Sequence, residues 1–231
     1  MEEKEGLLIR PIAHIRTPFP EKFGIPRQSG RVEEITGRIE FLPAYRNPDA
    51  LRRITEFSHL WLLFDFSEAH RAGFIPTVRP PRLGGNERVG VFASRSPFRP
   101  NPIGLSAVRL LRVEHTEAKG DVLIVAGADL LDGTPIFDIK PYLPFADSIP
   151  EASGGYAAAL TGHCLRVDWS LIGQNPLTEE ETRVLTACLA EDPRPSYQED
   201  GREYKMRFSS YDVAFTVEGD TLRITSIREE S

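Results

Sequence analysis

Several common features of proteins are scarce or absent in this sequence of 231 residues. It has only two cysteines, Cys164 and Cys188, and no Cys-x-x-Cys pair, so neither a disulfide-rich fold nor a thiolate zinc site is expected. No apolar run approaches the roughly 20 residues of a membrane-spanning helix, and the charged start Met1–Glu5 does not resemble a signal peptide. These absences predict a cytoplasmic protein with no membrane partner.

Sequence motifs of several large enzyme classes are missing as well. The chain has no glycine-rich dinucleotide or P-loop fingerprint, no His-Glu-x-x-His pair and no Gly-x-Ser-x-Gly turn. Its five histidines never fall at a spacing typical of metal ligands, so no bound metal is expected. Dinucleotide redox chemistry, P-loop phosphoryl transfer and zinc hydrolysis therefore have little support.

The hydrophobic pattern predicts a mainly β protein. Short apolar or alternating segments separated by turns indicate at least six strands before residue 170. The clearest of them are Val32–Phe41, His59–Phe66, Leu105–Val113 and Val122–Leu130. No convincing amphipathic helix joins one strand to the next, which disfavours a parallel sheet. We therefore expect a single-sheet antiparallel β-barrel over residues 1–170, with Gly162–Trp169 as its final strand.

The pattern changes from about Leu177. Thr178 and Glu181 have the spacing of a capping box, and apolar residues then recur on one helical face. Three further strands are expected over Tyr204–Phe208, Val213–Val217 and Leu222–Ile227. Residues 171–231 are thus predicted to form a smaller α+β domain.

Positive charge is concentrated in one part of the chain. The whole sequence has a formal net charge of −6, but the segment from Arg71 to Arg112 contains eight arginines, no lysine and one acid, Glu87. Arginine is favoured where phosphate or carboxylate is bound through paired hydrogen bonds. On composition alone, this basic segment is either a solvated surface or an anion-binding face.

Three loops combine a proline-restricted backbone with polar side chains. They are Pro26-Arg27-Gln28, the segment Ser94–Gly104 with three prolines, and Asp132-Gly133-Thr134-Pro135 followed by Asp138–Tyr142. Proline fixes φ and so lowers the entropy lost when a loop is ordered. One such loop is usually a plain turn, but three in one chain indicate a site built on a β scaffold.

Five motifs in a fixed order carry a family resemblance. They are Phe23–Gly30, Phe57–Trp61, Arg79–Asn86, Gly90–Gly104 and Asp129–Tyr142. Together they closely resemble the TsaA/TrmO family, S-adenosylmethionine-dependent tRNA methyltransferases with a single-sheet β-barrel core. The resemblance runs from about Leu7 to Ser148 and continues more weakly to the last strands. It implies methylation of N6 of threonylcarbamoyladenosine at position 37 of tRNA by a homodimer that binds its cofactor near the subunit interface.

The same resemblance implies a set of cofactor contacts. They fall on Pro26, Arg27, Gln28, Ser67, Glu68, Arg95, Leu105, Asp132, Gly133, Thr134 and Pro135. One departure from the family pattern is Ser67, which stands where many relatives have histidine.

Candidates for catalysis and RNA binding come from the residues themselves. Asp138, Asp132 and Lys140 share rigid loops, where a carboxylate can collect the N6 proton while an amine polarises the urea. Arginines contact phosphates and stack on splayed bases of RNA loops. The candidates for RNA binding are Arg79, Arg82 and Arg99.

Two other functions are compatible with these residues. A non-catalytic RNA-binding β-barrel would use the same arginines without binding S-adenosylmethionine. A methyltransferase of a small nucleotide-like substrate would leave the basic segment as a solvated surface.

Overall fold

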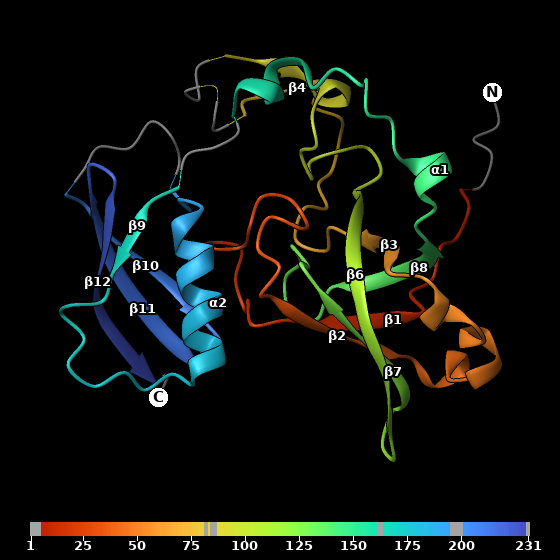
Figure 1. The fold of residues 1–231 in the computed structure, drawn as a ribbon. Coiled ribbons are helices and arrows are strands. Elements are labelled where there is room, and N and C mark those ends of the chain that lie inside the picture. Colours follow the sequence, from red (N-terminus) through yellow and green to blue (C-terminus); the bar gives the residue numbers. More distant parts are fainter. Residues whose placement is uncertain (1–5, 81–82, 84–86, 161–163, 195–200, 230–231) are drawn as a thin grey trace.

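Strands dominate the structure, as the hydrophobic pattern predicts. The computed structural model describes residues 6–80, 83, 87–160, 164–194 and 201–229 (Figure 1). The larger of its sheets contains β1 (Ala13–Arg16), β2 (Thr36–Phe41), β3 (His59–Asp65), β6 (Ile103–Thr116), β7 (Gly120–Ala126) and β8 (Pro135–Pro141). Most strand pairs are antiparallel and the helices are few and short, so the prediction of a mainly β, antiparallel protein is confirmed.

The six strands of the larger sheet form a ring. Their order is β1-β2-β7-β6-β3-β8, and the sheet closes on itself because β8 pairs with β1 as well as with β3. Alternate residues point inward, as Leu60, Leu62 and Phe64 do on β3, and they fill the interior with apolar side chains. Trp61 and Leu63 lie on the outer face of the same strand and are partly exposed.

Short turns and small elements connect the strands of the ring. Between β2 and β3 the chain forms η1 (Pro43–Tyr45), η2 (Pro48–Leu51) and η3 (Ile54–Glu56). Asn47 caps η2 by accepting a hydrogen bond from the Asp49 amide at 3.0 Å. The connection from β3 to β6 contains β4 (Thr77–Val78), β5 (Val89–Gly90) and η5 (Val91–Ala93), and β8 is followed by α1 (Pro144–Asp147) and η6 (Gly155–Leu160).

A second sheet lies in the C-terminal part of the chain. Its order is β10 (Glu203–Phe208), β11 (Tyr211–Glu218), β12 (Thr221–Glu229) and β9 (Arg166–Asp168), with β9 parallel to β12. The three predicted C-terminal strands are therefore confirmed.

The strand expected over Gly162–Trp169 belongs to this second sheet and not to the ring. Residues 162 and 163 lie outside the described residues, and Arg166–Asp168 pair with the edge of β12. The ring is already closed by β8, so it offers no free edge to a further strand.

Helix α2 (Glu179–Ala190) packs on the second sheet (Figure 1). The Thr178 hydroxyl accepts a hydrogen bond from the Glu181 amide at 3.2 Å, and the Glu181 carboxylate accepts one from the Thr178 amide at 3.0 Å. The predicted capping box is thus confirmed. None of the described helices is long and apolar enough to cross a membrane.

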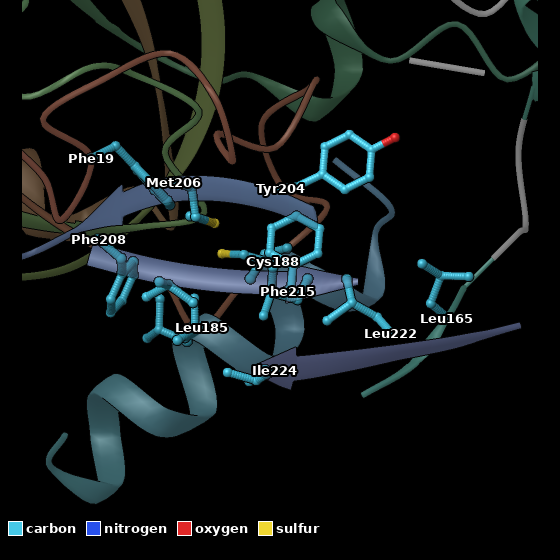
Figure 2. Packing of buried hydrophobic residues seen from close by; sticks show 14 of the residues in the cluster. Phe19, Leu165, Leu185, Cys188, Tyr204, Met206, Phe208, Phe215, Leu222 and Ile224 are labelled. Atoms are coloured by element: carbon cyan, nitrogen blue, oxygen red, sulfur yellow. The ribbon is translucent and has the colours of Figure 1, made fainter. Parts of the chain in front are cut away.

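One segment from the N-terminal part completes the C-terminal core. Phe19, Val32 and Ile35, which flank the Pro26–Gln28 loop, are buried among side chains of α2 and β10–β12. The rings of Phe19 and Phe208 lie edge to face, with centroids 6.0 Å apart (Figure 2). The C-terminal sheet therefore packs directly on the segment that carries this loop.

Gly24 is required by this packing. Its φ is +95°, and a Cβ at this position would lie 2.2 Å from Cε of Met206. Nearby, the Ser209 amide donates a hydrogen bond to the Pro18 carbonyl at 2.7 Å. Glycine in the Phe23–Gly30 motif thus allows β10 to approach the loop closely.

Candidate functional site

A cavity of about 610 Å³ lies at one end of the six-stranded ring. Its walls come from the loop before β2, the end of β3, the segment between η5 and β6, and the loop between β7 and β8. This volume is typical of sites for small molecules and cofactors. Side chains that are far apart in the sequence meet here because antiparallel strands place these four segments at the same end of the ring.

Most of the predicted cofactor contacts line this cavity. They are Pro26, Arg27, Gln28, Ser67, Glu68, Arg95, Leu105 and Thr134, together with the RNA-binding candidate Arg99. Asp132, Gly133 and Pro135 lie outside its lining, as do Asp138, Lys140 and Arg79. Arg82 falls outside the described residues.

Arg95 and the Pro26–Gln28 loop are joined by a side-chain hydrogen bond. The Arg95 guanidinium donates through Nη1 to Oε1 of Gln28 at 2.5 Å. Arg27 donates from Nη2 to the carbonyl of Arg194 at 2.7 Å, so the C-terminal part of the chain also holds this loop. The result is a polar wall with two guanidinium groups and a fixed amide.

The departure at Ser67 does not remove imidazole from this region. His70 lies three residues further on, and its Nε2 is 2.8 Å from Oδ1 of Asp65, which lines the cavity. Glu68 forms an ion pair with Lys22, with 3.0 Å between Oε2 and Nζ. The end of β3 therefore carries carboxylates that already have partners.

Arg99 holds the proline-rich loop in shape. Its Nη1 donates to the carbonyls of Ser94 at 2.7 Å and Val91 at 3.2 Å. The neighbouring Phe98 ring is covered by the guanidinium of Arg71, whose Cζ is 3.6 Å from the ring centroid. Arginines of the basic segment thus act within the loop as well as facing solvent.

The catalytic candidates from the sequence are engaged in ion pairs. Asp132 accepts a hydrogen bond from the Thr17 amide at 3.0 Å and pairs with Arg16 at 3.3 Å, which ties the β7–β8 loop to β1. Asp138 and Lys140 pair with each other on β8, with 2.8 Å between Oδ2 and Nζ.

Sequence reasoning missed Asp129, a carboxylate inside the cavity. Its Oδ1 accepts a hydrogen bond from Oγ of Ser106 at 2.6 Å. Burial raises the pKa of Asp129, while hydrogen bonds from Ser106 and the Ser29 backbone and the charge of Arg95 lower it in part. The available signal was its position, because Asp129 lies between Ala128 and the apolar pair Leu130-Leu131.

These features together define a class of protein: a β protein with a cavity of ligand size between stiff, arginine-bearing loops at one end of a closed sheet. Two family models match the chain, the tRNA-methyltransferase O N-terminal domain over residues 14–148 and the TrmO C-terminal domain over residues 163–230. The chain belongs to the tRNA-methyltransferase O family.

Individual proteins agree with this assignment. A tRNA (adenine(37)-N6)-methyltransferase of Escherichia coli is 44% identical over 216 residues, covering 89% of this chain and 91% of the relative. A Pyrococcus abyssi protein named "Probable S-adenosyl-L-methionine-binding protein" is 44% identical over 138 residues, 60% of this chain and 69% of the relative. The crystal structure of TrmO from Pseudomonas aeruginosa has a TM-score of 0.77 at 34% identity and covers 99% of this chain and 100% of that chain.

Proposed function

We propose that this protein is an S-adenosylmethionine-dependent methyltransferase that methylates N6 of threonylcarbamoyladenosine at position 37 of tRNA. The observation that carries this proposal is the cavity, because the loops marked by the family motifs meet around it. The Escherichia coli relative, named for N6 methylation of adenine 37, supports the same reaction.

The residues present fit the cofactor. The cavity has the volume of a cofactor site and combines apolar surface with guanidinium, amide and carboxylate groups. Pro26–Gln28, Ser67, Glu68, Arg95, Leu105 and Thr134 would hold the cofactor, which supplies a methyl group activated on a sulfonium. Asp132, Gly133 and Pro135 contribute by shaping the loop behind Thr134.

The protein's main task is positioning. Methyl transfer from a sulfonium needs little covalent help, and well-oriented reactants can gain about 7 kcal/mol or more in barrier height. The Gln28–Arg95 hydrogen bond and the Arg99 contacts to loop carbonyls keep the cavity walls in place. The loops therefore lose little further entropy when a ligand binds.

The acceptor nitrogen needs only a weak base. It lies between a purine and a urea carbonyl, so its N–H is more acidic than that of a plain exocyclic amine. Asp138, Asp132 and Lys140 are proposed to handle this proton or the neighbouring urea, although each already has an ionic partner. If turnover of the Asp138→Asn variant falls by no more than a few-fold, Asp138 is excluded as the group that accepts the N6 proton.

The basic segment is proposed to bind the anticodon loop. Arg79 is exposed, and the stacked rings of Phe74 and Phe92 are 56% and 72% exposed, with centroids 6.0 Å apart. Such rings and guanidinium groups suit unstacked RNA bases. Affinity for tRNA should fall steeply with salt, and replacing Arg79 by Ala should lower the salt slope by about one.

Further parts of the proposal concern assembly and location. We propose that the ring is the family's β-barrel and that the enzyme is a cytoplasmic homodimer. The boundary predicted between residues 1–170 and 171–231 is proposed to lie before β9, because β9 pairs with β12 in the second sheet. Ile103, Leu105 and Leu111 support the dimer, because they expose apolar side chains on β6 and Leu105 also lines the cavity. Sedimentation velocity should give twice the 25.9 kDa of one chain.

Two measurements test the central proposal. Mass spectrometry of tRNA nucleosides after incubation with S-adenosylmethionine should show threonylcarbamoyladenosine gaining the mass of one methyl group. Transfer RNA without the threonylcarbamoyl group is the matched control and should not react. Calorimetry with the cofactor alone distinguishes an enzyme from a pure RNA-binding protein, because the latter would give no heat of binding.

A further inference from the structure

The carboxylates that line the cavity differ in their partners. Glu68 pairs with Lys22, and Asp65 shares a hydrogen bond with His70. Asp129, in contrast, has no cation within ion-pair distance in the described part of the chain, and its hydrogen-bond donors are neutral groups. One negative charge in this cavity is therefore left without a close counter-ion.

Asp129 lies on the inner side of the cavity. It lies three residues after the end of β7, Leu130 beside it is buried, and Ser106, which donates to it, is only 3% exposed. Arg95, which also lines the cavity, is the cation whose charge lowers the pKa of Asp129, and the hydrogen bonds come from the Ser106 hydroxyl and from the backbone of Ser29 and of Asp129 itself. An anion placed in such surroundings is costly unless a positive charge joins it.

We propose that Asp129 recognises the positive charge of the cofactor and makes the site prefer the sulfonium donor to the neutral thioether product. This inference rests on the proposed function. An RNA base must approach from solvent, so a carboxylate on the inner wall faces the small ligand. Methyl transfer leaves the electron pair of the broken S–C bond on sulfur, while N6 gains the carbon and gives its proton to the base proposed above, from which it passes to water. The charge opposite Asp129 therefore disappears in the reaction, which favours product release.

The test compares two ligands that differ in this charge. The dissociation constants of S-adenosylmethionine and S-adenosylhomocysteine are measured by calorimetry for the full-length wild type, Asp129→Asn and the control Asp49→Asn. A charge–charge interaction of this kind is worth about tenfold in affinity, so Asp129→Asn should lower the preference for the sulfonium by about that factor. Asp49→Asn removes an equal charge outside the cavity lining, where the side chain is 71% exposed and solvent screens it, and should change the ratio by less than about twofold.

The outcomes separate this inference from the proposed function. An unchanged ratio in Asp129→Asn, with both ligands still binding, overturns the role of Asp129 alone. A wild-type protein that binds neither ligand overturns the proposed function itself.

A second variant keeps the carboxylate and changes its protonation. Ser106→Ala removes a hydrogen bond that stabilises the ionised form, so the pKa of Asp129 rises further. As the pH is lowered, the preference for the sulfonium should then be lost at a higher pH than in the wild type, and it should recover as the pH is raised. If the preference for the sulfonium is lost in Ser106→Ala and does not recover at higher pH, Ser106 has a structural role and the proposal is overturned. This test applies whether or not Asp129→Asn folds.

Discussion

The two sheets of this protein differ in where they place polar side chains. In the described chain the buried polar residues are Ser106 on β6 and Thr134 just before β8, and both line the cavity of the ring. The C-terminal core is apolar apart from the buried Tyr204 hydroxyl, which has no hydrogen-bond partner in the described structure. The ring thus accepts polar groups where a ligand can bind, whereas the second sheet is built for packing.

This difference assigns the second sheet a supporting role. It reaches the cavity through the segment that carries Pro26–Gln28, by way of the Phe19 contacts, the Arg27 hydrogen bond to Arg194 and a 2.8 Å ion pair between Arg31 and Glu191. Changes in the shared core should therefore affect both stability and cofactor affinity, whereas changes remote from it should affect stability alone.

The largest effect is expected for Phe19→Ala. Phe19 is fully buried in the shared core, and removing such a ring costs about 3–5 kcal/mol in the free energy of unfolding. Because the cavity loop loses its support, affinity for S-adenosylmethionine should fall as well. Denaturant unfolding and calorimetry check both effects, with Phe145→Ala as the control because that ring is 87% exposed. Normal affinity in a destabilised Phe19→Ala protein would contradict the supporting role.

A smaller loss is expected for Gly104→Ala in the ring. A Cβ at Gly104 would lie 2.2 Å from the Phe64 ring, and overpacking of this kind costs about 1–3 kcal/mol. Both residues line the cavity, so cofactor affinity should decrease with stability. Gly90→Ala is the matched control, since nothing lies within 4 Å of its added Cβ. Equal melting temperatures for the two variants would show that Phe64 moves without penalty.

Thr178→Ala should cost about 1 kcal/mol, because it removes the hydroxyl that caps α2. Thr178 itself belongs neither to the shared core nor to the lining of the cavity. The midpoint of urea unfolding should therefore decrease while the dissociation constant of S-adenosylmethionine stays the same. A parallel loss of affinity would mean that the helix end is coupled to the site.

The smallest effect is expected at low pH for Asp168 on β9. The Ser170 amide and Arg223 each donate a hydrogen bond at 2.9 Å and lower the pKa of Asp168 from 3.8 to about 2. A carboxylate whose pKa is lower in the folded state stabilises the fold at pH values above its unfolded-state pKa. This contribution disappears as the pH falls from about 4 to about 2. The stability difference between wild type and Asp168→Asn should shrink over the same range in acid-unfolding curves. A difference that is constant with pH would exclude this linkage.

Local patterns were sufficient for most elements of the fold. Alternation predicted β2, the length and aromatic content of a continuous apolar run predicted β3, and the Thr178–Glu181 spacing predicted the start of α2. The sheet that contains β9 could not be predicted, because a three-residue strand carries too little pattern and its partner β12 lies more than 50 residues away. Strand type is thus a local property, whereas sheet membership depends on which edges remain free.

The same distinction applies to the candidate site. Proline and arginine in Pro26–Gln28 and Ser94–Gly104 marked two cavity walls from the sequence. Asp129 was missed because its environment depends on Ser106, which lies 23 residues earlier and meets it only after the ring strands pair. In the sequence, Asp132 and Gly133 have the pattern of a plain Asp-Gly turn. In the structure, Asp132 lies outside the cavity lining because Arg16 and Thr17 hold it.

The shared core also affects the order in which the chain can mature during translation. Residues 17–35 leave the ribosome early, but Phe19, Val32 and Ile35 are buried by residues between 165 and 224. A nascent chain that has completed all six ring strands still lacks the apolar cover for this loop. The loop that carries Pro26–Gln28 should therefore reach its final packing late in synthesis, after the last strands emerge.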